Sequence, residues 1–397
     1  MKFLWVIIFL GISQISFGQD SLLNRNDTLK DLTDLFVRKR KARAAAKVER
    51  AVNFTFFPAI GYSLQTGFAA ALVGNMAFRL GEGDDVKFSS INTSPTYTQY
   101  NQTIIPLTAN IWSKNAKWNY SVDWRYMQYP STTWGLAGHG DPNDEGYTID
   151  FTYLKAHQIA LRGVTKNLFI GTGFFYDKFW NIRELTSNGQ PLDKSVVTQL
   201  RKQGLSARDE IGSGIPVRVL YDSRLNQINP TNGWYVNVTW RDNLKSLGSG
   251  RDWQSLVVDV RKYFRISKSG NTLALWVYSW RSGTNTPYLL LPSTGWDDAY
   301  NTGRGYIQGR FRSNIMNYLE AEYRFRLTRN GLLGGVVFAN VQSYKQNLTL
   351  GSELLAPAGG AGLRIKLNKT SGANLCIDYG IGQNGSQGFF VNLGEVF

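Results

Sequence analysis

The side chains that could carry out covalent or metal chemistry are few in this sequence. It contains two histidines, His139 and His157, and one cysteine, Cys376. Neither histidine lies at motif spacing from a nucleophile, and no G-x-S-x-G, H-E-x-x-H or phosphate-binding Gly-Lys motif occurs. The segment Gly380–Gly385 fits G-x-G-x-x-G, but no helix is expected after it, so we interpret it as a hairpin turn. We expect no enzyme activity, no cofactor and no metal site.

Charged side chains instead alternate with apolar ones in the segment Asn301–Thr328. There a Gly-rich loop carrying Arg304, Gly305 and Tyr306 leads into a strand whose successive side chains point to opposite faces. One face suits water and the other suits hydrocarbon, although a soluble sandwich would also fit this single strand. The polar face holds Tyr318, Glu320, Glu322, Arg324 and Arg326, and the apolar face holds Leu319, Ala321, Tyr323, Phe325 and Leu327.

The same alternation recurs in other segments and decides between the two interpretations. Wherever the pattern can be tested, the charges share one face of the strand. If that face met lipid, each Arg or Lys near the bilayer centre would cost about 2–4 kcal/mol, so we expect it to line a lumen. The lumen charges predicted in this way are Arg218, Asp222, Arg241, Arg324, Arg326, Arg364, Lys366 and Asp378.

The composition also fits a membrane barrel. The chain has 397 residues, of which 40 are Gly, 22 Phe, 20 Tyr and 12 Trp, and only 18% are charged. Gly suits tight turns, and aromatic residues suit strands and membrane interfaces. We expect aromatic girdles near the strand ends, formed by residues such as Trp124, Tyr126, Trp240, Trp276 and Trp280.

The elements that position these side chains are expected to be strands throughout residues 53–397. From Asn53 onward, segments of alternating polarity are joined by alternately short and long connections. The first two segments are Phe54–Tyr62 and Phe68–Phe78. We count about 16 strands and predict an all-β fold, a transmembrane antiparallel β-barrel. Long connections such as Arg281–Phe311 would all lie at the outer end.

The N-terminal residues are expected to direct export. Residues 1–18 have the charged start, the short apolar run and the small residues at a cleavage site that are typical of a signal peptide. Residues 19–52 would form a short periplasmic leader, with a helical apolar stripe in Leu29–Arg50. The leader would be loosely ordered, or a helix that enters the barrel or lies on the inner leaflet. No later apolar run of about 18 residues occurs, which excludes a helical membrane protein.

The formal net charge of +15 is consistent with a barrel that has a basic lumen. Such a charge is compatible with nucleic acid, acidic lipid or a basic pore lining. We expect no nucleic-acid partner for an exported protein. Inward-facing Lys and Arg side chains account for the charge instead.

The chain end is expected to close the barrel. Gly388–Phe397 has the pattern of a strand with an aromatic last residue, and an open sheet edge cannot be satisfied in hydrocarbon. We therefore expect this strand to pair with the first one. Phe389, Val391, Leu393 and Phe397 would alternate outward and form the C-terminal signal of the barrel.

Several motifs resemble one known family. Gly214–Trp240 contains Tyr-Asp-x-Arg followed by Pro-x-x-Gly and then a strand, and Arg304-Gly305-Tyr306 precedes Glu322-Tyr323-Arg324. In this order and spacing, and with the ending FFVNLGEVF, these motifs resemble the bacterial surface antigen superfamily of outer-membrane assembly factors (BamA/TamA type). The resemblance covers about residues 54–397.

The resemblance implies a barrel of 16 strands whose first and last strands pair weakly. It also implies a sixth outer loop that folds back into the lumen, where the signature Arg304 meets Glu320 or Glu322 on the wall. Arg can bond a carboxylate through two N–H groups, and Gly305 lets the backbone approach the wall. Asn340 departs from the family, which usually has Asp there. We therefore expect a weaker latch, or one that depends wholly on the two Glu residues.

The resemblance also implies periplasmic polypeptide-transport-associated (POTRA) domains. The segment Gln19–Val52 is too short to hold even one of them. The chain is therefore expected to be a barrel-only member of the family.

The function implied by the resemblance is outer-membrane biogenesis, or translocation of protein or lipid through a lateral seam between Phe54–Tyr62 and Phe389–Phe397. Two alternatives stay open: a passive solute channel with a basic lumen, and a non-enzymatic barrel that anchors a partner protein. The expected location is the outer membrane. The expected partners are outer-membrane lipid and lipopolysaccharide, together with client or periplasmic proteins, and the oligomeric state is not determined.

Overall fold

The computed structural model describes residues 29–31, 52–81, 89–136, 146–185, 209–267, 270–298, 301–345, 353–369 and 372–397. The predicted signal peptide lies outside these residues. So does the predicted leader helix, except for Leu29–Asp31. No helix in the described ranges is long and apolar enough to cross a bilayer.

The described residues form an all-β fold of 18 strands with two short 3-10 helices. The first nine strands are β1 (Val52–Ser63), β2 (Gly67–Phe78), β3 (Ser89–Thr93), β4 (Thr96–Thr98), β5 (Thr103–Trp112), β6 (Trp118–Gln128), β7 (Ser131–Thr133), β8 (Tyr147–Gly163) and β9 (Leu168–Leu185). The others are β10 (Glu210–Asp222), β11 (Gly233–Asn243), β12 (Trp253–Arg265), β13 (Thr272–Ser282), β14 (Ile315–Arg326), β15 (Leu333–Lys345), β16 (Leu354–Lys366), β17 (Asn374–Gly382) and β18 (Gln387–Leu393). The helices are η2 (Lys245–Leu247) and η3 (Tyr288–Leu290).

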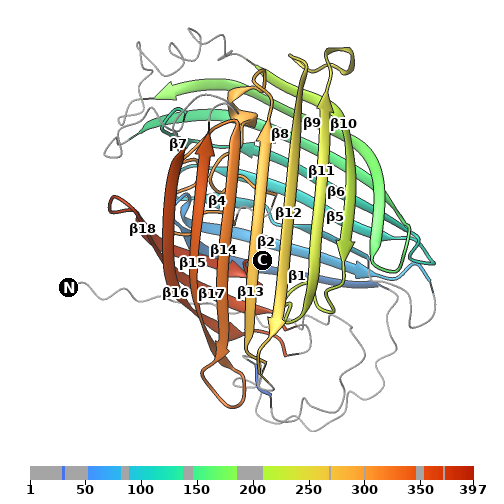
Figure 1. Cartoon of the computed structure of the whole chain (residues 1–397), viewed down its shortest axis with the longest axis vertical. Coiled ribbons are helices and arrows are strands. Elements are labelled where there is room, and N and C mark those ends of the chain that lie inside the picture. The colour runs from blue at the N-terminus through green and yellow to red at the C-terminus, as the bar shows by residue number, and fades with distance from the viewer. Residues whose placement is uncertain are drawn as a thin grey trace.

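These strands form one closed antiparallel barrel (Figure 1). The short strands β3 and β4 both lie between β2 and β5, and β6 and β7 both pair with β8. Each of these two pairs occupies one position, so 18 strands fill 16 positions. The first and last strands meet through the pair Ser63↔Phe390. The prediction of an all-β antiparallel barrel of about 16 strands is confirmed, and insertion into a membrane stays a prediction.

The alternation of residue types explains why these segments form the wall. In β14, Leu319 is half exposed on the outer surface, whereas its neighbours Tyr318 and Glu320 are buried inside. The outer surface likewise exposes Val217 and Val277. A period of two therefore separates an apolar outer surface from a polar interior.

The long connection between β13 and β14 fills part of the barrel instead of standing above it. Its helix η3 and Leu291 are buried in a cluster with wall residues that include Phe151, Phe179 and Trp253. Further along the same connection, Arg304 and Tyr306 are also buried. Burial of these apolar residues against the wall stabilises the inward course of the loop.

The chain end differs from the prediction. Strand β18 ends at Leu393, and Gly394 takes a positive φ of 89°, which turns the last three residues inward. Phe397 is only 3% exposed, and its ring lies 5.1 Å from that of Trp276, so its predicted outward position is wrong. Figure 1 marks the C-terminus within the outline of the barrel. The alternation rule fails here because a positive-φ glycine ends the strand.

The aromatic girdle is also different from the prediction at Trp276. Its ring is fully buried on the inner face, where Nε1 donates to Oδ1 of Asp259 at 2.8 Å. Trp280 shares that inner face, whereas Trp124 and Trp240 are exposed on the outer surface. A polar partner inside the barrel lets an indole face the lumen, which residue type alone did not indicate.

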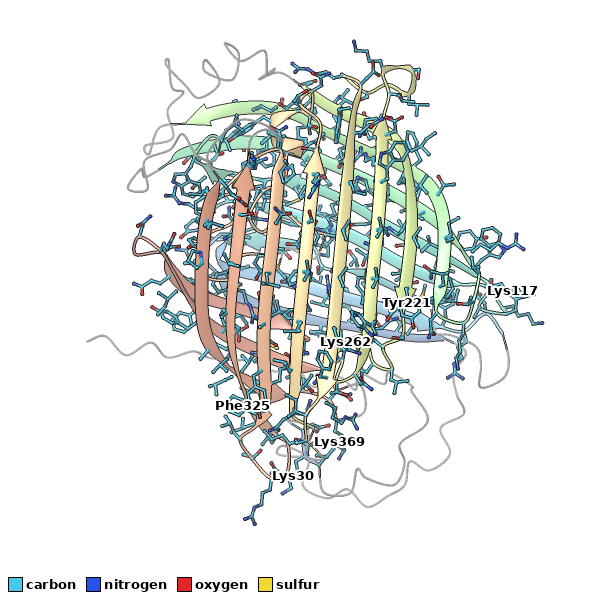
Figure 2. The ribbon with its side chains drawn as sticks, in the orientation of Figure 1. Lys30, Lys117, Tyr221, Lys262, Phe325 and Lys369 are labelled. Atoms are coloured by element: carbon cyan, nitrogen blue, oxygen red, sulfur yellow. The ribbon has the colours of Figure 1, made fainter. Side chains whose placement is uncertain are left out.

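The described part of the leader contacts the end of the barrel that carries short turns. The backbone N–H of Lys30 donates to the Asn330 carbonyl at 2.9 Å, and the N–H of Lys369 donates to the Asp31 carboxylate at 3.1 Å. Figure 2 shows Lys30 and Lys369 near each other at this end. Residues 29–31 are thus held on the turns between β14 and β15 and between β16 and β17.

Candidate functional site

The candidate site is the contact between Arg304 and the inner wall. Arg304 is 2% exposed, and its Nη2 donates to the carboxylates of Glu320 and Glu322. Its Nη1 donates to Oδ2 of Asp378 at 2.6 Å. The guanidinium also stacks 3.8 Å above the centre of the Phe338 ring. One loop side chain is therefore bound by three carboxylates from β14 and β17.

The neighbouring glycines let the loop approach the wall. Gly305 has a φ of +108°, and a Cβ there would lie 2.7 Å from Cβ of Ala358. Gly303 is also left-handed, with a φ of +82°. A side chain at either position would clash or strain the backbone, so the motif places the Arg304 backbone directly on β16.

Tyr306 fixes the loop on its other side. Its hydroxyl donates to the Pro357 carbonyl at 2.6 Å and accepts the Gln383 N–H at 3.0 Å. Its ring packs against Phe311 at 5.2 Å. Ser386 adds a hydrogen bond from its hydroxyl to the Gly305 carbonyl at 2.7 Å. The loop is thus bound to β16 and to the hairpin between β17 and β18.

Asn340 does not face the guanidinium as an acceptor. Its Nδ2 donates to the Arg304 carbonyl at 2.9 Å, and its Oδ1 has no partner among the described residues. The residue therefore holds the loop backbone instead of the Arg304 charge. Asp378 takes part in the ion pair, although the sequence indicated only that it faces the lumen.

The charges of the site are strongly coupled. Burial alone would lower the pKa of Arg304, but the carboxylates of Glu320, Glu322 and Asp378 outweigh it and raise that pKa well above its ordinary value. The guanidinium therefore stays charged at any physiological pH. Buried ion pairs of this kind are strongly destabilised when one partner is removed.

Two further arginines extend the network to the chain end. Arg324 Nε pairs with Glu322 at 2.5 Å, and Arg364 bonds Asp378 at 2.5 Å and Glu395 at 2.8 Å. Asn301, in the loop, donates to the Val396 carbonyl at 2.6 Å. The loop, the wall and the last residues of the chain are therefore one connected polar unit. In the alternation that places Phe389, Val391 and Leu393 outward, Glu395 would face outward too, so that pattern gave no signal for this contact.

The other predicted lumen charges lie on the inner face but outside this network. Arg241 pairs with Asp177 at 2.6 Å, and Asp222 pairs with Arg224 at 2.9 Å. Lys366 donates to the Gly372 carbonyl at 3.2 Å, and Arg326 is exposed near a short turn. Arg218 bonds the Thr239 hydroxyl at 2.8 Å. Among the predicted C-terminal signal residues, Phe389 and Leu393 are exposed outward, Val391 is half-buried, and Phe397 lies inside.

The arrangement braces the loop against the wall. Its members are guanidinium, carboxylate, amide and phenol groups, and each described ion pair links the loop or the chain end to the wall or joins wall residues. The ion pairs offset part of the conformational entropy that is lost when such a long connection is ordered.

Comparisons with known proteins agree with this architecture. No protein-family model and no curated protein matches the sequence. Among solved structures, the chain is similar to BamA from Haemophilus ducreyi lacking POTRA domains 1-3, with 12% identity and a TM-score of 0.53 over 86% of this chain and 69% of that one.

Two further structures are similar to the same extent. CdiB from Acinetobacter baumannii has 11% identity and a TM-score of 0.56 over 87% of this chain and 60% of that one. CdiB from Escherichia coli has 10% identity and a TM-score of 0.57 over 88% of this chain and 63% of that one. At these identities the likeness shows the fold, a 16-stranded barrel of the BamA and CdiB type. The chain spans less than two thirds of the length of either CdiB structure.

Proposed function

We propose that the protein is an outer-membrane barrel that acts in outer-membrane biogenesis, moving protein or lipid through a lateral seam between β1 and β18. The expected partners are outer-membrane lipid, lipopolysaccharide and client proteins.

The observation that carries the proposal is the weak seam. Strands β1 and β18 share one register pair, Ser63↔Phe390, whereas β1 pairs with β2 over 12 residues and β17 with β18 over seven. Along Val52–Tyr62, no described strand pairs with the other edge of β1. Unpaired backbone groups at a sheet edge are costly in hydrocarbon and are a template for another strand.

The side chains of β1 fit a surface that meets lipid or a client strand. Phe54 and Ile60 are each 71% exposed, more than most wall residues of their size. Phe56 is also exposed. An apolar strand with a free edge would disturb the nearby bilayer. It would also offer a client strand both backbone hydrogen bonds and apolar contacts.

The register shows what would close the seam. Continued downward from Ser63↔Phe390, the pairing would place Leu393 opposite Ile60 and Phe397 opposite Phe56. The last residues are instead bound inside the barrel, where Arg324 donates to the backbone oxygen of Phe397 at 2.8 Å. The withdrawn residues 394–397 therefore cannot pair with Phe56–Ala59.

A cross-link across the seam tests the proposal. Ile60→Cys and Leu393→Cys, in a Cys376→Ser background, would fix β18 along β1. The readout is the rate at which the protein, reconstituted in lipid vesicles, promotes insertion of an unfolded small barrel. We expect the oxidised variant to lose this activity and to regain it on reduction.

The matched control is Ala59→Cys with Ala71→Cys, a register pair between β1 and β2 that does not cross the seam. Its activity should not change on oxidation. Undiminished insertion by the seam-locked protein would contradict the proposal.

A further inference from the structure

A cavity lies inside the barrel on the side opposite the Arg304 network. It has a volume of about 300 Å³ and adjoins a smaller one of about 100 Å³. Both are lined by His157, Phe175, Arg218 and Asp298, so they are two parts of one space. A volume of this size is at the lower end of the range for small-molecule sites.

Most charges around this cavity are already paired. Lys155 contacts Asp123 at 2.8 Å and Asp298 at 3.2 Å, and Arg125 pairs with Asp123 at 2.6 Å. Arg241 pairs with Asp177, whose Oδ2 also contacts His157 at 2.9 Å. The three carboxylates are therefore each engaged by at least one cation.

Arg218 is the exception. Its Nε donates to the Thr239 hydroxyl at 2.8 Å, and no ion pair links its guanidinium to a carboxylate of the described residues. Its side chain is half-buried and lines both parts of the cavity. The guanidinium borders a space that the Asp298 carboxylate also lines, and an anionic ligand would compete with that carboxylate for its terminal N–H groups.

The smaller part of the cavity adds an apolar wall and an unused donor. Trp280, on β13, is half-buried and lines this smaller part of the cavity. Its ring can pack against a sugar or another ring of a ligand. Nε1 of Trp253 is buried and donates to no group among the described residues. A buried N–H without a partner is costly, so a ligand acceptor would complete it.

We propose that this cavity binds a small organic anion of about the size of a hexose, with its phosphate or carboxylate on Arg218 and its body against Trp280. Trp253 would donate to an oxygen of the ligand. The inference is independent of the lateral seam, because none of its residues lies on β1 or β18. Binding and insertion activity can therefore fail separately.

The test uses the full chain in detergent, with glucose 6-phosphate, glucuronate, glucose and inorganic phosphate as probes. Three tryptophans line the smaller part of the cavity, so binding is followed by tryptophan fluorescence and checked by calorimetry. We expect saturable binding of one of the two sugar anions and none of glucose. In Arg218→Gln the affinity should fall about tenfold to hundredfold, and Arg218→Lys should keep part of it.

The matched control is Arg326→Gln, which removes the same charge at an exposed position near a short turn. Its affinity should equal that of the unchanged protein. Trp280→Leu should weaken the sugar anion more than inorganic phosphate. The proposal is overturned if neither sugar anion binds saturably, or if Arg218→Gln binds the sugar anion with the same affinity as the unchanged protein. It is also overturned if inorganic phosphate binds as tightly as both sugar anions.

Discussion

Arg324 on β14 donates a hydrogen bond of 2.8 Å to the backbone oxygen of Phe397, the last residue of the sequence. The same guanidinium pairs with Glu322, which also binds Arg304 of the inward-folded loop. The loop and the chain end are therefore held by one set of wall charges. A change at either one is expected to affect the other, which links the loop to the strand that forms the seam.

Removal of the Arg304 guanidinium from the loop should destabilise the barrel strongly. Arg304→Ala would leave Glu320, Glu322 and Asp378 buried without their shared partner, at a cost of about 3–5 kcal/mol. We expect a lower free energy of unfolding in detergent and faster proteolysis within the loop. Arg326→Ala, an exposed arginine, should change neither. Equal protease resistance of Arg304→Ala and the unchanged protein would mean that this ion pair does not hold the loop.

Replacing Asn340 by Asp, the residue that the family resemblance would imply at this position, should not strengthen the contact between the loop and the wall. In Asn340→Asp, a carboxylate would face the Arg304 carbonyl and the donated hydrogen bond of 2.9 Å would be lost. We expect the free energy of unfolding to fall by about 1–3 kcal/mol. Asn340→Ala, which adds no charge, should cost less. A more stable Asn340→Asp protein would show that the side chain can turn toward the guanidinium.

The two aromatic residues near the chain end should respond differently to truncation. Phe397 is 3% exposed inside the barrel, whereas Phe389 is 50% exposed outside. Phe397→Ala should therefore lower the free energy of unfolding by about 3–5 kcal/mol, and Phe389→Ala by much less in detergent. Chemical denaturation followed by tryptophan fluorescence checks this, because Trp276 packs on Phe397. A loss in Phe397→Ala as small as that in Phe389→Ala would place the Phe397 ring outside.

The loop should show a pH dependence that originates from Asp297. Burial raises the pKa of Asp297 above its ordinary value, although its carboxylate accepts bonds from Asn301 and Thr302. The stability linked to a raised carboxyl pKa is complete below the unfolded-state pKa and is lost as pH rises through the folded-state pKa. Asp297→Asn should therefore gain stability relative to the unchanged protein as pH rises from acid to neutral. Unfolding measured across that interval checks the sign, and a constant difference would exclude ionisation of Asp297 as the cause.

Much of the wall could be predicted because it depends on a local rule. Side chains alternate in any strand, so the inward positions of Glu320, Glu322 and Arg364 follow from their spacing alone. The strand count also follows, since each strand is an alternating segment between turns. The pairing of Arg304 with the two Glu residues was implied by the family resemblance, and the structure has both contacts.

Other features depend on contacts between distant parts of the chain. Trp276 faces inward because Asp259 on the neighbouring strand accepts its N–H. Asp378 joins the Arg304 site because β17 lies three strands from β14 on the same side of the wall, where the inward-folded loop reaches both. Spacing along one strand contains no such information.

By itself, the sequence determined an antiparallel barrel with a polar interior, because the period of two sets which side of each strand meets which solvent. Only the tertiary structure decided where the ends go. Gly394 turns the chain inward, and Glu395 and Phe397 are bound by Arg364, Arg324 and Trp276, which come from three different strands. Residues 394–397 therefore do not pair with Phe56–Ala59 of β1, since a chain that turns away cannot complete the pairing that its alternation predicts.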